Sequence, residues 1–65
     1  MNDYENLCTH YQSKGYKFVG SVNFDTKAVE AYQKSKNKQE HKIGCCEYLI
    51  ACHDLKVFML MDSGD

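Results

Sequence analysis

Four cysteines and three histidines in this 65-residue chain could bind a metal ion. A structural zinc site needs four ligands that converge on one point, usually delivered as close pairs such as C-x₂₋₄-C. Cys45 and Cys46 are adjacent, and Cys8 and His10 lie two residues apart on a predicted helix, so the members of each pair point away from each other. The remaining set of His41, Cys45 and Cys8 would need ligands from a second chain. We therefore predict no metal and no cofactor.

Nucleophilic catalysis is the other chemistry that these residue types suggest. A Cys–His pair must lie within hydrogen-bond distance and be oriented by a third group. Cys52 and His53 are neighbours at the end of a predicted strand, where consecutive side chains diverge. The sequence shows no Ser/His/Asp set, no paired carboxylates and no phosphate-binding glycine loop. We predict no catalytic residues and a protein that is not an enzyme.

The amino-terminal residues and the cysteines indicate a compartment. Residues 1–5 are acidic where a signal peptide would be basic, so we expect no export. Adjacent cysteines on a strand cannot easily bond to each other, and we expect four reduced thiols in a cytoplasmic protein. The longest apolar run, residues 57–61, is far too short to span a membrane, so no membrane partner is expected.

The charges are unevenly distributed along the chain. Residues 27–42 hold five lysines against two glutamates, a net +3, whereas the whole chain carries −1 and has no arginine. A basic segment of this kind can contact phosphates or an acidic protein surface. The absence of arginine and the negative total weigh against nucleic acid, which we keep as the less favoured partner. The predicted basic contact residues are Lys34, Lys36, Lys38 and Lys42.

Hydrophobic periodicity predicts a helix followed by a strand in the first part of the chain. A helix is expected over residues 3–14, with Asn2 as N-cap and Gly15 at its end. Its apolar stripe has helical spacing and consists of Tyr4, Leu7, Cys8 and Tyr11. Residues 16–24 alternate as in a strand, with Gly20 as a bulge or a close backbone approach. One face of this strand carries Tyr16, Phe18, Val22 and Phe24, and the other includes Val19.

A second helix is predicted to begin at Asp25-Thr26, with Asp25 or Thr26 as N-cap and a hydrophobic staple between Phe24 and Val29. Its apolar stripe ends at Tyr32, and every residue from 33 to 42 is polar. We expect this helix to give way to a solvated loop within residues 34–40.

A β-hairpin is predicted from residues 43–52 and 55–62, joined by a two-residue turn at 53–54. This register places Cys52 opposite Leu55 and Ile50 opposite Val57. The expected fold is a small single α+β domain over residues 1–65, in the order α-β-α-β-β. It has a three-stranded, mainly antiparallel sheet, a C-terminal hairpin and a loose tail at 63–65.

Both faces of the predicted hairpin are apolar, which is unusual for a sheet with one solvated side. If both helices and the Phe18 face of the first strand cover the Ile50 face, an apolar patch remains on the other face. The residues then predicted to bind a partner are Val19, Glu47, Leu49, Lys56, Phe58 and Leu60. The alternative is that one helix packs on each face, which leaves none of these apolar residues exposed.

These observations predict a small non-enzymatic interaction protein that inhibits a larger host protein or complex by masking its surface. Phe58 and Leu49 are the expected anchors, and a second copy of the chain is the alternative partner. Proteins of this size without site chemistry are frequent among phage and mobile-element proteins that counter host defence, as anti-CRISPR proteins do. The competing hypothesis is a small nucleic-acid-binding regulator that uses the lysines of residues 27–42.

Overall fold

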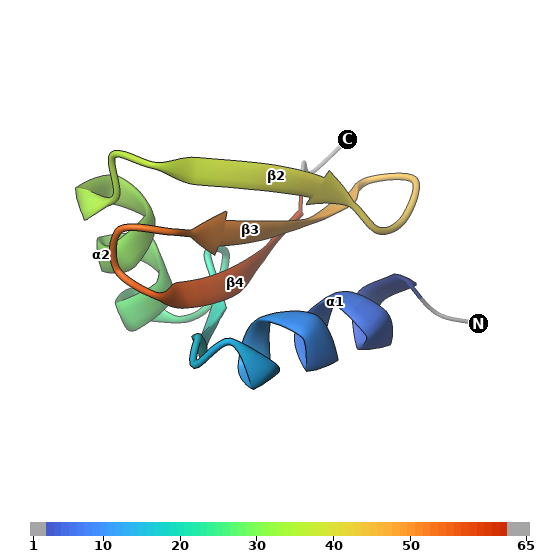
Figure 1. Ribbon diagram of the computed structural model, residues 1–65. Helices are drawn as coiled ribbons and strands as arrows, with labels where there is room; N and C mark the ends of the chain where they lie inside the picture. The colour runs from blue at the N-terminus through green and yellow to red at the C-terminus, as the bar shows by residue number, and fades with distance from the viewer. Residues whose placement is uncertain (1–2, 63–65) are drawn as a thin grey trace.

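Two helices lie against a four-stranded mixed sheet in the computed structural model, which describes residues 3–62 (Figure 1). The elements are α1 (Asp3–Ser13), β1 (Lys17–Ser21), α2 (Thr26–Lys34), β2 (Lys38–Lys42), β3 (Glu47–Cys52) and β4 (Val57–Asp62). The strand order is β1-β4-β3-β2. β1 runs parallel to β4, and the other neighbouring pairs are antiparallel. The fold is therefore α+β as predicted, with one strand more than expected and one parallel pair.

The helices form where the apolar periodicity predicts them. The stripe of α1 packs into the core through Tyr4, Leu7, Cys8 and Tyr11. Asp25 caps α2, because its carboxylate accepts a hydrogen bond from the Lys27 backbone N–H at 2.9 Å. The predicted staple is wrong, since Phe24 is 91% exposed. The predicted N-cap Asn2 and the tail at 63–65 lie outside the described residues.

β1 is shorter than predicted and bends at Gly20. The strand ends at Ser21, and its register with β4 shifts between Phe18 and Ser21. Gly20 has φ +110°, and a side chain there would collide with the Asp25 carboxylate. The predicted bulge and close approach at Gly20 are therefore confirmed.

The structure reverses the predicted faces of β1. Val19 packs with Ile50 and Met59, and not on the side of Leu49 and Phe58 where the sequence placed it. Phe18 instead packs against Phe58 in a tilted arrangement, with ring centroids 5.5 Å apart. The face of β1 follows from its parallel pairing with β4, which the sequence pattern did not reveal.

The C-terminal hairpin forms with a different turn. Its pairs run from Cys52↔Val57 to Glu47↔Asp62, so residues 53–56 make a four-residue turn. Lys56 adopts φ +57° at the end of this turn. The register is displaced by two residues from the prediction, and an even displacement keeps every side chain on its predicted face. The expectation of two apolar faces is therefore correct although the pairing was wrong.

β2 begins within the segment that was predicted to be a loop, and it includes residues 38–40 of that segment. Its five residues, KQEHK, pair antiparallel with β3 from Lys38↔Cys52 to Lys42↔Tyr48. The strand lies at the edge of the sheet, where lysines discourage pairing with another chain. A polar edge strand has no row of apolar side chains facing the core. Its sequence therefore lacks the apolar alternation from which strands were predicted.

Each helix covers its own face of the sheet, which is the alternative that the sequence left open. On the α1 face the buried cluster consists of Tyr11, Tyr16, Leu49, Ala51 and Phe58. On the α2 face it consists of Ala28, Ile50, Cys52 and Met59. Leu49 and Phe58 are 0% exposed, so the prediction that they anchor a partner is wrong. They belong to the core because α1 packs over them.

Candidate interaction groove beside helix α1

The structure separates the six residues that were predicted to bind a partner. Leu49 and Phe58 are buried in the core, and Val19 packs on the α2 side. Lys56 lies in the turn after β3, with its ammonium 5.1 Å from the centre of the Tyr16 ring. Glu47 and the half-buried Leu60 remain together, and both line a hollow next to α1.

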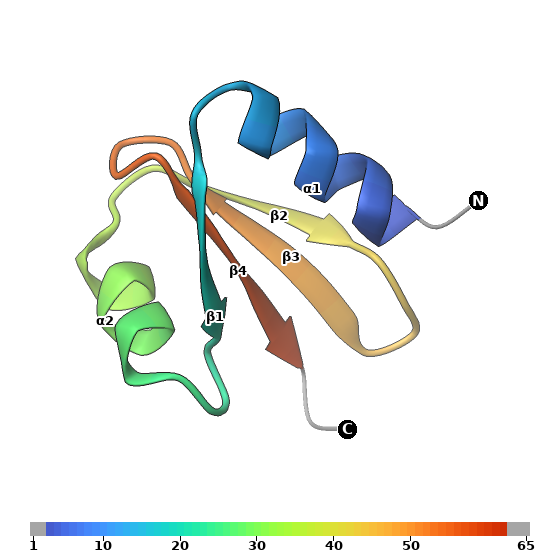
Figure 2. The same cartoon turned by 90° about the horizontal axis from the view of Figure 1, so that it is seen from below.

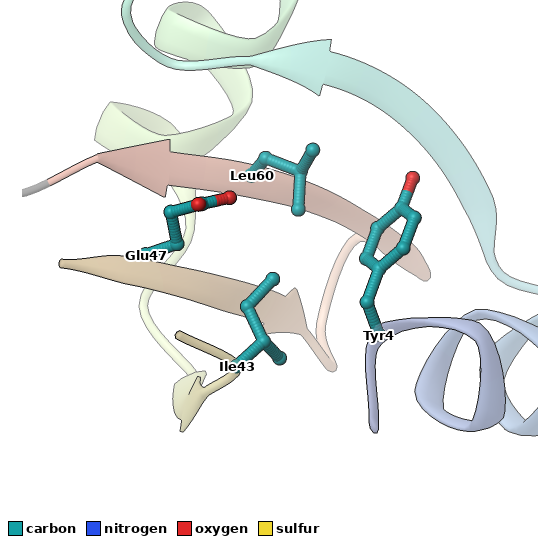
Figure 3. Close-up of a pocket in the computed structure, with 4 residues that line it drawn as sticks. All are labelled: Tyr4, Ile43, Glu47 and Leu60. Atoms are coloured by element: carbon teal, nitrogen blue, oxygen red, sulfur yellow. The ribbon is translucent and has the colours of Figure 1, made fainter. Parts of the chain in front are cut away.

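This hollow has a volume of about 300 Å³ and is lined by Tyr4, Ile43, Glu47 and Leu60. Figure 3 shows the Glu47 carboxylate and the Tyr4 ring on opposite sides of it, with Leu60 and Ile43 between them. Glu47 and Leu60 come from neighbouring strands, and the backbone N–H of Ile43 donates to the Glu47 carbonyl at 3.0 Å. The hollow is thus formed where α1 passes over the ends of β3 and β4.

Two further hollows adjoin the first. One, of about 360 Å³, shares Tyr4 and reaches Phe18. The other, of about 240 Å³, shares Glu47 and Leu60 and reaches Phe24. We call these three hollows the α1 groove. The groove residues used below are Tyr4, Glu5, Cys8, Phe18, Phe24, Glu47, Leu60 and Asp62.

The α1 groove exists because one short helix cannot cover four strands. A helix with its side chains is about 10 Å wide, whereas three strand spacings of about 4.8 Å separate the edges of the sheet. α1 leaves β1 at a wide angle and lies towards β2, as Figure 2 shows. The part of the face over β1 and β4 is therefore only half covered.

Exposed aromatic side chains are concentrated along the groove. Phe18 is 45% exposed and Phe24 is 91% exposed, and they line the hollows at the two ends of the groove. Burial and a hydrogen bond with Cys8 raise the pKa of Tyr4 above 10.0, so this side chain is a neutral phenol at physiological pH. Glu5, Glu47 and Asp62 are exposed on the same lining. The groove thus has an apolar floor and an acidic rim.

Tyrosine–histidine contacts fasten α1 to the sheet. The Tyr11 hydroxyl lies 2.7 Å from His41 Nε2 on β2, and the Tyr16 hydroxyl lies 2.7 Å from His53 Nδ1. His53 Nε2 lies 3.0 Å from Gln39 Oε1, so the ring also contacts β2. His10 also packs edge-on against Tyr11 at 5.1 Å. The rings of all three histidines of the sequence therefore lie around the ring of Tyr11.

We expect this cluster to lower the free energy of unfolding in mild acid. Burial lowers the pKa of His41 below 6.5, and the nearby His53 and His10 lower it further. Since the unfolded chain binds the proton more readily, the contribution of His41 is complete above about pH 6.5 and declines as the pH falls towards the folded pKa. Thermal unfolding followed by circular dichroism at pH 7.5 and 5.5 should show a lower Tm at the acidic pH. In His41→Gln, which keeps a hydrogen-bonding side chain, the difference should shrink, and an unchanged difference would contradict the role of His41.

The predicted basic contact residues are partly engaged in holding the fold. Lys38 donates from Nζ to the carbonyls of Ser35 at 2.7 Å and Tyr32 at 3.1 Å, where it caps the end of α2. The Asp54 carboxylate accepts hydrogen bonds from the Ser35 hydroxyl at 2.6 Å and the Lys36 N–H at 2.9 Å. These two bonds lower the pKa of Asp54 to about 2. Lys34 and Lys42 are exposed.

The cysteines and histidines do not assemble a metal site. Within residues 3–62, no three His, Cys, Asp or Glu side chains gather as a metal centre would require. The four cysteines, all within the described residues, form no disulfide, and burial raises the pKa of Cys52 above 9.0. Cys8, His41 and Cys45 are not brought together.

The candidate surface that sequence reasoning missed is the α1 groove. Of the residues that line it, Glu47, Leu60 and the buried Phe58 were among the predicted contacts. Phe18 and Phe24 were assigned to a covered strand face because the strand was expected to continue to residue 24. No helix of the described chain is long and apolar enough to cross a membrane. Comparisons with protein-family models, with curated proteins and with solved structures found no match to this chain.

Proposed function

We propose that this chain is a non-enzymatic interaction module that masks a surface of a larger protein, and that it binds through the α1 groove. The half-covered α1 face of the sheet supports the proposal most directly, since it leaves Phe18 partly in solvent beside an apolar hollow. Phe24, in the turn after β1, is exposed beside the hollow at the end of β4. Exposed apolar residues that gather beside a groove often mark an interaction surface, and aromatic anchors supply much of the binding energy in such surfaces. Masking by steric exclusion needs no catalytic group, only a surface that fits the partner.

The nucleic-acid hypothesis has weaker support. Lys38 is engaged at the end of α2, and Glu40 lies between Lys38 and Lys42 on the same side of β2. Only Lys34, Lys36 and Lys42 of the four predicted contacts are left for phosphates, and arginine is absent from the sequence. We therefore place the nucleic-acid function second.

Affinity capture with groove variants tests the proposal. We expect the wild-type chain to retain a protein from a lysate of its source organism after nuclease treatment, and Phe18→Asp to lose it. Phe24→Asp should also reduce retention, and because Phe24 is 91% exposed this change should leave the fold intact. Leu55→Asp is the matched control, since Leu55 is 41% exposed in the turn after β3 and lies outside the groove.

Equal retention by Phe18→Asp, Phe24→Asp and wild type would refute the groove as the binding surface. Loss of the captured material on nuclease treatment would favour the nucleic-acid function instead. Circular dichroism of each variant separates a binding defect from a folding defect.

A further inference from the structure

We propose that the occupant of the α1 groove is an amphipathic helix of a partner protein that carries lysine or arginine beside its apolar face. This inference rests on the proposed function and adds the chemistry of the partner. Three features support it: the charge of the groove lining, the width of the sheet that α1 leaves uncovered, and the burial of the apolar stripes of α1 and α2.

The lining of the groove is acidic. Glu5, Glu47 and Asp62 line its three hollows, and no lysine is found among the residues that line them within the described chain. Lys17 and Lys27 line a separate hollow that also touches Phe18. Lys17 pairs with Val57, which packs on the α2 face, so Lys17 is directed away from the α1 groove. A partner that places cations beside its apolar contacts would meet carboxylates, whereas an acidic partner would be repelled.

The shape of the uncovered face suits a helix. The hollow at Phe18 lies on the α1 face of the sheet, between α1 and Phe58 of β4. The hollow at Phe24 lies at the end of β4, where Met61 of the α2-side cluster also lines it. A second helix beside α1 would complete the layer, since four strands at a spacing of about 4.8 Å occupy about 19 Å and one helix covers about 10 Å of this width. Three adjoining hollows would receive successive apolar side chains from one face of the helix, as in helix-in-groove recognition.

An added strand is a poorer occupant. The free edge of β1 is only five residues long and is interrupted by the bulge at Gly20. Such an edge offers few consecutive backbone groups for pairing. The other edge, β2, carries lysines and a glutamate along its length.

A second copy of the chain is also a poor source of this helix. The apolar stripe of α1 packs into its own core through Tyr4, Leu7 and Tyr11. The stripe of α2 is likewise used, with Ala28 0% exposed and Tyr32 packed against the same cluster. Neither described helix has a spare apolar face to offer, so the occupant belongs to a different protein.

A peptide-display selection against the full chain tests this inference. The library presents random peptides of about 16 residues, or roughly four helical turns. We expect enriched peptides to show apolar residues at helical spacing, flanked by lysine or arginine, and to lose binding to Phe24→Asp. Synthetic versions should become helical on binding, as circular dichroism would show.

Charge reversal identifies the role of the rim. For the enriched basic peptides, Glu5→Lys combined with Glu47→Lys should weaken binding by about tenfold or more in fluorescence anisotropy, and more so at low salt. Glu30→Lys combined with Glu40→Lys is the matched control, since both residues are exposed outside the groove lining and the net charge changes equally.

The outcomes separate the two proposals. Groove-dependent peptides that lack helical spacing or basic residues would overturn the inference and leave the proposed function standing. The same holds if both charge-reversed pairs weaken binding equally. If no selected peptide depends on Phe18 or Phe24, the groove is not a binding surface and both proposals fail. Self-association in analytical ultracentrifugation that Phe24→Asp abolishes would identify the occupant as a second copy and overturn the inference.

Discussion

Phe58→Asp is expected to prevent folding altogether. Phe58 is 0% exposed at the centre of the α1-side cluster and contacts the rings of Tyr11 and Phe18, at centroid distances of 6.1 and 5.5 Å. Truncating a buried phenylalanine costs about 3–5 kcal/mol, and a buried, unpaired carboxylate costs more. At about 0.05–0.15 kcal/mol per residue, a chain of 65 residues has only about 3–10 kcal/mol of stability in total.

The measurement is far-UV circular dichroism together with amide dispersion in a proton–nitrogen NMR spectrum. We expect Phe58→Asp to give the narrow dispersion of an unfolded chain, and Phe24→Asp, a change to the same residue type at a 91% exposed position, to stay native. A well-dispersed spectrum for Phe58→Asp would restore Phe58 as a surface residue and remove the basis for the α1 groove.

Gly20→Ala should be the most damaging of three glycine substitutions. Gly20 has φ +110°, and its new Cβ would meet the Asp25 carboxylate that caps α2. Strained backbone costs about 1–3 kcal/mol and loss of an N-cap about 1 kcal/mol more, so we expect a loss of about 2–4 kcal/mol. Because Asp25 also closes the turn after β1 by donating its N–H to the Ser21 carbonyl at 2.7 Å, the damage should extend to the β1–α2 connection.

Gly15 and Gly44 serve as internal controls. Gly15 has φ +91° with no atom near a new Cβ, so Gly15→Ala tests backbone strain alone. For Gly44→Ala the nearest atom is 3.5 Å away and no positive φ is involved, so a change within about 0.5 kcal/mol is expected. Urea denaturation should give the order Gly20, Gly15, Gly44 from the largest loss to the smallest. Equal losses of unfolding free energy for Gly15→Ala and Gly20→Ala would show that the contact with Asp25 does not contribute to the effect.

Much of the fold was predictable because local periodicity determines it. α1 and its stripe follow from apolar residues at helical spacing, and the capped start of α2 follows from Asp25. The two apolar faces of β3 and β4 follow from alternation, which survived a displacement of two residues. These features depend on neighbours in the sequence and on no distant partner.

The candidate site was less predictable because it depends on distant contacts. The parallel pairing of β1 with β4 sets the face that Phe18 occupies, and α1 packs over Leu49 and Phe58 instead of joining α2 on the other face. The polar edge strand β2 widens the sheet beyond what one helix can cover, yet it carries no apolar signal of its own. Because β2 was not predicted, the groove that it helps to create was not predicted either.

The position of β4 between β1 and β3 also bears on how the chain acquires its structure during synthesis. β1 emerges from the ribosome well before its hydrogen-bonding neighbour, since Lys17 pairs with Val57 and Phe18 with Phe58. Until translation has passed residue 62, the first strand has no strand to dock on, and the aromatic residues near it stay in contact with water. Maturation of the native sheet is therefore a late and concerted event, and nascent chains halted before β4 should be sensitive to protease along their whole length.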